Sequence, residues 1–160
     1  MRALTGLALL LGVTALALSV VTLLQDDPQW QEVRLGLVEK EDGFKFTDVA
    51  PEARSEEDIS AGDSFAFSGD VSGERKGRLL GACGVADKGE PTCQATYTFD
   101  DGQITVAGEP DFTQQAETFL LPVTGGSGAY GGASGQVRVR ETGEADQAEH
   151  DVTLLLPKRD

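Results

Sequence analysis

The stretch that decides the fold runs from Gly81 to Gly108 and reads GACGVADKGEPTCQATYTFDDGQITVAG. In its second half, apolar and polar residues alternate on both sides of Asp101-Gly102, which is the pattern of two antiparallel strands joined by a type I′ turn. In its first half, Cys83 and Cys93 flank a short polar loop, as in a second hairpin. Because the two hairpins share a strand, the stretch predicts a three-stranded meander.

The register of this meander follows from placing Cys83 opposite Cys93. Leu79 then lies opposite Tyr97, and a loop of Asp101 and Gly102 places Tyr97 opposite Val106. Residues paired across antiparallel strands point to the same face of the sheet. One face therefore collects the apolar side chains, namely Leu79, Cys83, Cys93, Ala95, Tyr97, Phe99, Ile104 and Val106. We expect this face to lie on the core and the polar face to lie in water.

Further short alternating runs lie on both sides of the meander. They are Trp30–Glu39, Phe44 with Phe46, Phe65 with Phe67, Phe119–Val123, Val137 with Val139, and Val152–Leu156. No segment after residue 24 keeps a period of 3.6 residues, which excludes an amphipathic helix there. About eight strands separated by turn signals predict an all-β domain, either a barrel or a sandwich.

Composition excludes several classes of function. The 160 residues include 13 Lys and Arg against 27 Asp and Glu, a net charge of -14. Such an acidic chain lacks the basic surface that nucleic-acid binding requires. One His and two Cys do not make a zinc cage and argue against a catalytic triad. We therefore expect no metal site, and we expect His150, in an acidic stretch, to lie on the surface.

The N-terminal segment from Ala3 to Leu24 contains no charged residue. It is long enough for an uncleaved membrane anchor, and Ala15-Leu16-Ala17 is a candidate signal-peptide cleavage site. Residues 1–27 are therefore expected to be a hydrophobic helix that serves as a signal peptide or membrane anchor, with a helix buried in the domain as the alternative. Residues 28–160 would then be extracytoplasmic, either secreted or held at the outer face of the plasma membrane.

Export of a chain with two cysteines favours a disulfide between Cys83 and Cys93. Two separate buried thiols are the alternative. The Gly-rich stretch 125–135 holds six glycines in eleven residues. A phosphate-binding loop would require a Lys-Ser/Thr pair and a strand–loop–helix frame, which are missing here. We expect instead a tight connection between two strands, with Tyr130 closing one end of the core.

Several sequence blocks together resemble the allene oxide cyclase-like barrel family, which is related to dirigent proteins and to bacterial spirotetronate-type cyclases. These blocks are Gly62-Asp63-x-x-x-Phe67, Gly81-x-Cys83, Ala95-Thr96-Tyr97-x-Phe99, Gly102-Gln103-Ile104-x-Val106-x-Gly108 and Val123-Thr124-Gly125-Gly126-Ser127-Gly128-x-Tyr130-x-Gly132-Ala133-x-Gly135-Gln136-Val137. The resemblance implies an eight-stranded antiparallel barrel with a central cavity, assembled as a homodimer or homotrimer.

The resemblance also implies a function. It suggests a cofactor-free cyclase or isomerase that binds a hydrophobic, polyketide-like intermediate and steers its ring closure, for example by a pericyclic [4+2] reaction. The alternative is an exported, non-catalytic, dirigent-like module that binds an apolar small molecule. In the plant cyclases a Glu on the first strand and an Asn contribute to the site. Glu32 and Gly69 occupy those places here, and Cys83 matches a third site residue.

We expect Tyr97 and Glu32 to be the catalytic residues. The hairpin register points Tyr97 inward, where its hydroxyl could orient a carbonyl, although core packing is an equal alternative. For Glu32 the alternative is a solvated carboxylate. The expected pocket wall consists of Trp30, Phe65, Phe67, Leu79, Phe99, Val106, Phe119 and Tyr130. Arg138 and Arg140 would bind an acidic ligand or, alternatively, pair with surface acids.

Overall fold

The computed structural model describes residues 29–49, 59–87, 90–110 and 118–158. The expected N-terminal helix, with both alternatives for its role, lies outside these residues. Within the described ranges no helix is long and apolar enough to cross a membrane. By its contacts the chain divides into Met1–Trp30, almost all of it outside the described ranges, and Gln31–Asp160, which forms the folded domain.

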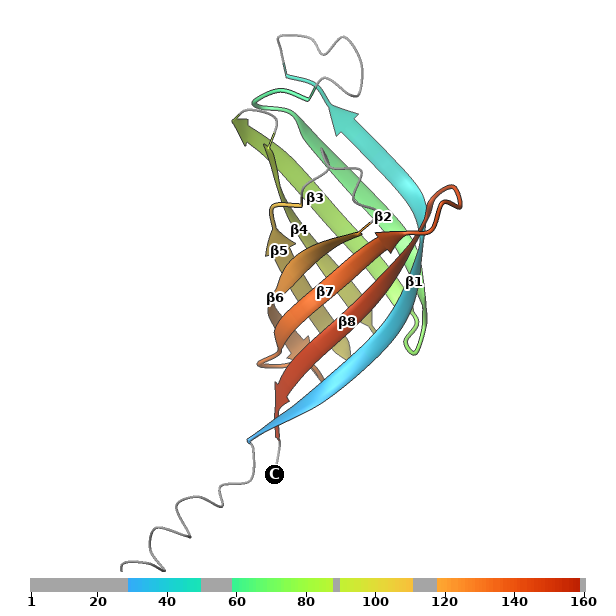
Figure 1. Ribbon diagram of the computed structural model, residues 1–160, viewed down its shortest axis with the longest axis vertical. Helices are drawn as coiled ribbons and strands as arrows, with labels where there is room; N and C mark the ends of the chain where they lie inside the picture. The colour runs from blue at the N-terminus through green and yellow to red at the C-terminus, as the bar shows by residue number, and fades with distance from the viewer. Residues whose placement is uncertain (1–28, 50–58, 88–89, 111–117, 159–160) are drawn as a thin grey trace, which may run out of the picture. The chain divides into compact units, whose positions relative to one another are not determined.

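The folded domain is a closed antiparallel barrel in which each strand pairs with the next along the chain (Figure 1). The strands are β1 (Trp30–Thr47), β2 (Ser64–Gly73), β3 (Gly77–Asp87), β4 (Glu90–Phe99), β5 (Gly102–Gly108), β6 (Thr118–Gly128), β7 (Ser134–Glu141) and β8 (Gln147–Pro157). The expected eight-stranded barrel is thus confirmed. Closure removes both sheet edges, so alternate residues of every strand must face the interior.

Two of the runs expected as separate strands form one strand, β1. A bulge between Glu41 and Gly43 interrupts its register with β2. The extra residue changes which positions point inward, from the odd-numbered Leu37 before the bulge to the even-numbered Phe44 after it. The bulge therefore keeps both apolar runs on the inner side of one long strand.

The predicted meander is confirmed except in its second turn. Leu79 pairs with Tyr97 and Cys83 with Cys93, as expected. However, Tyr97 pairs with Ile104 rather than with Val106. The turn therefore comprises Asp100 and Asp101, and Gly102 already belongs to β5. Because the shift is by two residues, every side chain keeps its expected face.

The interior of the barrel is filled at one end and hollow toward the other. Three aromatic rings run through it in contact: Tyr97 stacks on Phe99 with ring centroids 6.4 Å apart, and Phe99 packs on Tyr130 at 5.6 Å. Around Phe99 and Tyr130 the side chains pack densely; Leu37, Val71, Ile104, Val106, Val123, Val137, Val152 and Leu154 are all buried. We call this the Tyr130 end and the opposite end the mouth.

The Gly-rich stretch forms the connection that closes the Tyr130 end, as predicted. Gly128 has a φ of +60°, and a Cβ on it would lie 2.4 Å from the carbonyl oxygen of Asp101. Gly135 has a φ of +135°, and its Cβ would lie 2.0 Å from the carbonyl oxygen of Thr153. Tyr130 is buried between these glycines, and its hydroxyl accepts a hydrogen bond of 3.1 Å from Nε of Arg75. The glycines therefore serve close backbone packing.

Asp63 fixes the backbone on both sides of the β1–β2 connection. Its carboxylate accepts hydrogen bonds from the amides of Val49, at 3.0 Å, and Ser60, at 2.7 Å, although the residue is almost completely buried. These bonds to the charged form, led by the one from Ser60, hold the pKa of Asp63 below its usual value. The Gly62-Asp63 block is thus structural.

The expected disulfide joins Cys83 to Cys93. It links β3 to β4 on the inner face of the sheet, toward the mouth. A stable disulfide is consistent with an oxidising, extracytoplasmic compartment.

Replacement of Gly135 by Ala should destabilise the barrel by about 1–3 kcal/mol, because φ is positive and the backbone of Thr153 cannot yield easily. Gly84→Ala is the matched control, since a Cβ at Gly84 meets nothing within 4 Å. We expect that control to be neutral or to stabilise by about 0.5 kcal/mol. Urea unfolding of both variants measures the difference, and equal stabilities would contradict this account of the motif.

Asp63→Asn should lower the melting temperature at neutral pH, since an amide nitrogen would replace one accepting oxygen. A depressed folded-state pKa stabilises the fold above the unfolded value of about 4, and this stabilisation is lost as pH falls through the folded value. The difference in melting temperature between wild type and variant should therefore be largest near pH 7 and become smaller below pH ~4. Asp151→Asn, an exposed control, should show no such difference. A difference that persists unchanged in strong acid would refute the assignment.

Candidate functional site

A small, largely apolar cavity lies in the barrel between the packed core and the mouth. Its volume is about 70 Å³, and it is lined by Glu39, Phe67, Leu79, Cys83, Cys93, Ala95, Tyr97, Pro110, Phe119, Leu121, Val139 and His150. This is room for about two water molecules and well below the 300 Å³ or more that is typical of sites for drug-sized ligands. The expected central cavity is present but much smaller than the resemblance led us to expect.

Tyr97 places its hydroxyl at the polar side of this cavity. The side chain comes from the middle of β4, is 1% exposed, and lies 2.5 Å by its hydroxyl oxygen from Nδ1 of His150. Burial, and secondarily the charge of Glu39, raises the pKa of Tyr97 well above its usual value. The hydroxyl therefore keeps its proton at neutral pH. We infer that it donates this proton to Nδ1, which leaves Nε2 to carry the ring proton of His150.

Glu39 on β1 and His150 on β8 lie next to each other on the inner face of the barrel. Nε2 of His150 lies 3.1 Å from Oε2 of Glu39, but the pair lacks hydrogen-bond geometry. Both Nε2 of His150 and Oε1 of Glu39 are buried without a hydrogen-bond partner among the described residues. Buried polar atoms are nearly always satisfied, because an unpaired one costs about 1–3 kcal/mol. These two atoms therefore suit a polar ligand.

Gly69 on β2 provides the space that Glu39 occupies. A Cβ at this position would lie 2.6 Å from Oε1 and 2.8 Å from Cγ of Glu39. The position where the plant cyclases carry a polar Asn is thus vacated here for a carboxylate from the neighbouring strand. Any larger residue at Gly69 would displace Glu39 from His150.

The structure brings together only some of the expected site residues. Tyr97, Phe67, Leu79, Phe119, Cys83 and Cys93 all line the cavity. Phe99, Val106 and Tyr130 are buried, but they belong to the packed core beyond it. Phe65 lies nearer the mouth, where its ring packs on Phe44 at 6.0 Å. Trp30 is 51% exposed at the start of β1 and does not line the cavity.

Two expectations about polar residues are wrong. Glu32 lies on the outer face of β1, where it is exposed and pairs with Arg34 at 2.6 Å. The alternation of Val33, Leu35 and Leu37 already points even-numbered positions of this strand outward, which is the physical reason. His150, expected on the surface, is 3% exposed.

Sequence reasoning missed Glu39 and His150, although a signal for both was present. Glu39 continues the inward series of Leu35 and Leu37, and His150 begins the inward series of Val152 and Leu154. The alternation therefore indicates that both side chains point inward. This signal was overlooked because both residues are polar. Arg140 pairs with Glu149 on the outer face, in line with the surface alternative for the two arginines. Arg138, opposite Asp151, also points outward.

The sequence matches the family described as the allene oxide cyclase barrel-like domain over residues 45–154. The chain belongs to this family. The match runs from the end of β1 through β2 to β7 and into β8, which leaves Glu39 outside it. Among curated proteins no sequence match is found.

Several solved structures share the barrel fold with this chain at low sequence identity. A pyocyanin demethylase is 22% identical, with a TM-score of 0.63 over 76% of this chain and 99% of its own. AbnU, an exo-specific intermolecular Diels–Alderase, is 17% identical, with a TM-score of 0.63 over 79% and 98%. The pterocarpan synthase dirigent protein GePTS1 is 12% identical, with a TM-score of 0.64 over 84% and 90%. At these identities the likeness establishes the barrel fold.

Replacing Tyr97 by Phe should remove the hydrogen bond to His150 and leave Nδ1 unpaired in the interior. We expect a loss of about 1–3 kcal/mol of stability. His150 is the sole histidine of the chain, so its imidazole nitrogens give isolated NMR signals. The wild type should show the proton on Nε2, and the variant should relax toward a mixture. A proton found on Nδ1 of the wild-type imidazole would contradict the hydrogen-bond direction.

Proposed function

We propose that the protein binds a small, largely apolar molecule inside the barrel and promotes its ring closure or isomerisation. The observation that carries this proposal is the buried group Glu39, His150 and Tyr97 beside an apolar cavity, with two polar atoms unpaired. The family membership and the likeness to a Diels–Alderase and other cyclases support the same class of reaction.

The apolar wall contributes orientation. Phe67, Leu79, Phe119, Leu121 and Val139 come from four strands and leave little freedom for a flexible ligand. A wall of this kind holds a linear molecule in one folded conformer and excludes water from it, which lowers the entropic cost of ring closure. Such a reaction gains and loses no atoms, so no metal or cofactor is needed in this proposal.

The polar group contributes electrostatic stabilisation. With Tyr97 donating to Nδ1, the Nε2–H of His150 can donate to a carbonyl oxygen of the ligand. Negative charge grows on that oxygen as the dienophile or enone reacts, and a fixed donor in a dry site stabilises it. The adjacent carboxylate of Glu39 can accept a proton from a ligand hydroxyl. The cluster therefore acts as a donor–acceptor pair.

The size of the cavity sets the first requirement on the substrate. A polyketide-like molecule needs more than the 70 Å³ present, so Phe67 and Phe119 must rotate for it to enter. Both side chains are only partly buried at the mouthward side of the core, which makes their rotation the least costly way to enlarge the site. The small cavity is also compatible with the second candidate function, a dirigent-like module that binds without chemistry.

We further propose that the barrel acts outside the cytoplasm. The Cys83–Cys93 disulfide and the uncharged segment from Ala3 to Leu24 support this location. An anchored form would meet apolar molecules where they partition, at the membrane surface.

The proposal is tested with linear trienes that carry a tethered α,β-unsaturated ketone. We expect the protein to accelerate formation of the cyclohexene ring over buffer and to give one stereoisomer. Tyr97→Phe should lower the catalysed rate about tenfold to a hundredfold because it weakens the donor at His150, and Glu39→Gln should lower it because it removes the proton acceptor of the cluster. Liquid chromatography on a chiral column measures rate and selectivity together.

Glu32→Gln serves as the control, since it removes one carboxylate from the outer face of the same strand. It should leave the catalysed rate unchanged, and circular dichroism should confirm the fold of every variant. Trienes that raise the melting temperature but close at the buffer rate would favour the binding module. Trienes that neither bind nor react would refute an interior site for such molecules.

A further inference from the structure

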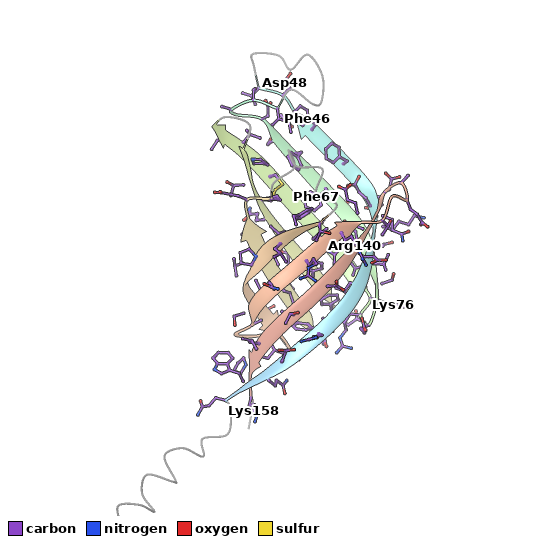
Figure 2. The ribbon with its side chains drawn as sticks, in the orientation of Figure 1. Phe46, Asp48, Phe67, Lys76, Arg140 and Lys158 are labelled. Carbon is purple, nitrogen blue, oxygen red and sulfur yellow. A yellow bond between two sulfur atoms is a disulfide. The ribbon has the colours of Figure 1, made fainter. Side chains whose placement is uncertain are left out.

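The mouth of the barrel carries two chemically different walls. β1 to β4 extend beyond β7 and β8 there (Figure 1). Phe44 pairs with Phe67, and Phe46 with Phe65, so all four rings share the inner face of this extension. Phe46 and Phe67 lie on the mouthward parts of β1 and β2 (Figure 2). This aromatic wall continues into the cavity, because Phe67 also lines it.

The second wall is acidic. A second hollow of about 410 Å³ lies where β1 meets the β7–β8 connection, and it is lined by Glu39, Glu41, Glu141, Gly143, Glu144, Ala145, Asp146, Gln147 and Ala148. No basic side chain is among the described residues that line it. The backbone fixes this arrangement, since the amide of Glu41 donates a 2.8 Å hydrogen bond to the carbonyl oxygen of Asp146.

The carboxylates of this hollow are crowded enough to affect one another. Burial, followed by the charges of Glu39, Asp146 and Asp42, raises the pKa of Glu41 above its usual value. Arg140, which precedes Glu141 in the chain, is paired with Glu149 on the outer face. The hollow thus holds negative charge that its own lining does not neutralise, and a cation entering it would be stabilised.

Glu39 connects this hollow to the interior cavity, because it lines both. The residue is 8% exposed, and its Oε1 has no hydrogen-bond partner among the described residues. The described acidic residues are not placed to hold a metal ion, since no group of three or more metal-ligating side chains comes together. An organic cation, which is larger and needs no fixed ligand geometry, fits this hollow better.

We infer that the mouth binds an organic cation with an aromatic body, the cationic head lying among Glu39, Glu41 and Asp146 and the body against Phe67. Phe44 and Phe65, which pack on each other in the same aromatic wall, offer further ring faces that attract cations. The inference rests on the proposed function only in taking the barrel interior as the ligand site. It names the class of molecule that the site accepts, namely aromatic ammonium or iminium compounds, which the apolar cavity alone does not specify.

The test uses three probes of equal shape and different charge. They are benzyltrimethylammonium, its neutral isostere neopentylbenzene, and the anion phenylmethanesulfonate. Titration of the full-length protein, followed by NMR, should show saturable one-to-one binding of the cation at least about tenfold tighter than of the neutral isostere. The anion should not bind. Raising the salt concentration should reduce the preference for the cation.

Variants locate the source of the preference. Glu41→Gln should reduce the preference for the cation about threefold or more, and Glu41→Gln with Glu141→Gln should reduce it further. Asp151→Asn removes the same charge from the outer face of β8 and should leave the preference unchanged, which controls for the net charge of the chain. Since these exposed or partly exposed carboxylates are not core residues, all variants should fold.

Equal affinity for the cation and its neutral isostere would overturn the inference. The same holds if Glu41→Gln and Asp151→Asn reduce the preference equally, because the cation would then respond only to overall charge. Failure of the proposed function gives a different result: the trienes would not react, while the preference for the cation and its loss in Glu41→Gln would remain.

Discussion

Closure of the barrel is the constraint on which the other features depend. With eight strands each paired to the next, no sheet edge remains, and every second residue of each strand must lie inside. The residues at these alternate positions therefore determine what fills the interior. At most of these positions the residue is Leu, Val, Ile or an aromatic residue, and these side chains pack together. On β1 and β8 these positions also hold Glu39 and His150, and Tyr97 on β4 reaches His150. These three side chains make up the polar part of the candidate site.

Much of the fold was predictable because local and long-range signals agreed. The register of β3 and β4 followed from two cysteines and a hairpin, and an error of two residues in the β4–β5 turn changed no face. The bulge in β1 was not predictable, because it inserts one residue within a run that reads as two strands. The size of the cavity was not predictable either. It depends on how far Phe67 and Phe119 reach across the barrel, which alternation does not determine.

The layout of the candidate site was predicted in part. The inward position of Tyr97 was predicted because the hairpin register fixed its direction. Glu39 and His150 were missed because a charged residue in an alternating run was interpreted as a surface position, although the apolar neighbours at two-residue spacing pointed inward. Glu32 was selected from the family resemblance, although the alternation of its own strand points it outward. The structure agrees with the alternation. In a closed barrel, the alternation of inward and outward positions thus predicts the direction of a side chain better than its polarity does. A polar residue at an inward position is a candidate for function.

The glycines that close the Tyr130 end have a consequence for how members of this family are compared. The most distinctive sequence block, around Tyr130, serves backbone packing at the end of the barrel farthest from Glu39 and His150. A search based on that block groups proteins by how the barrel is sealed. It carries no information on the inward residues toward the mouth. Relatives that share the seal are free to differ there, and comparing their candidate sites requires aligning the inward positions of β1, β4 and β8.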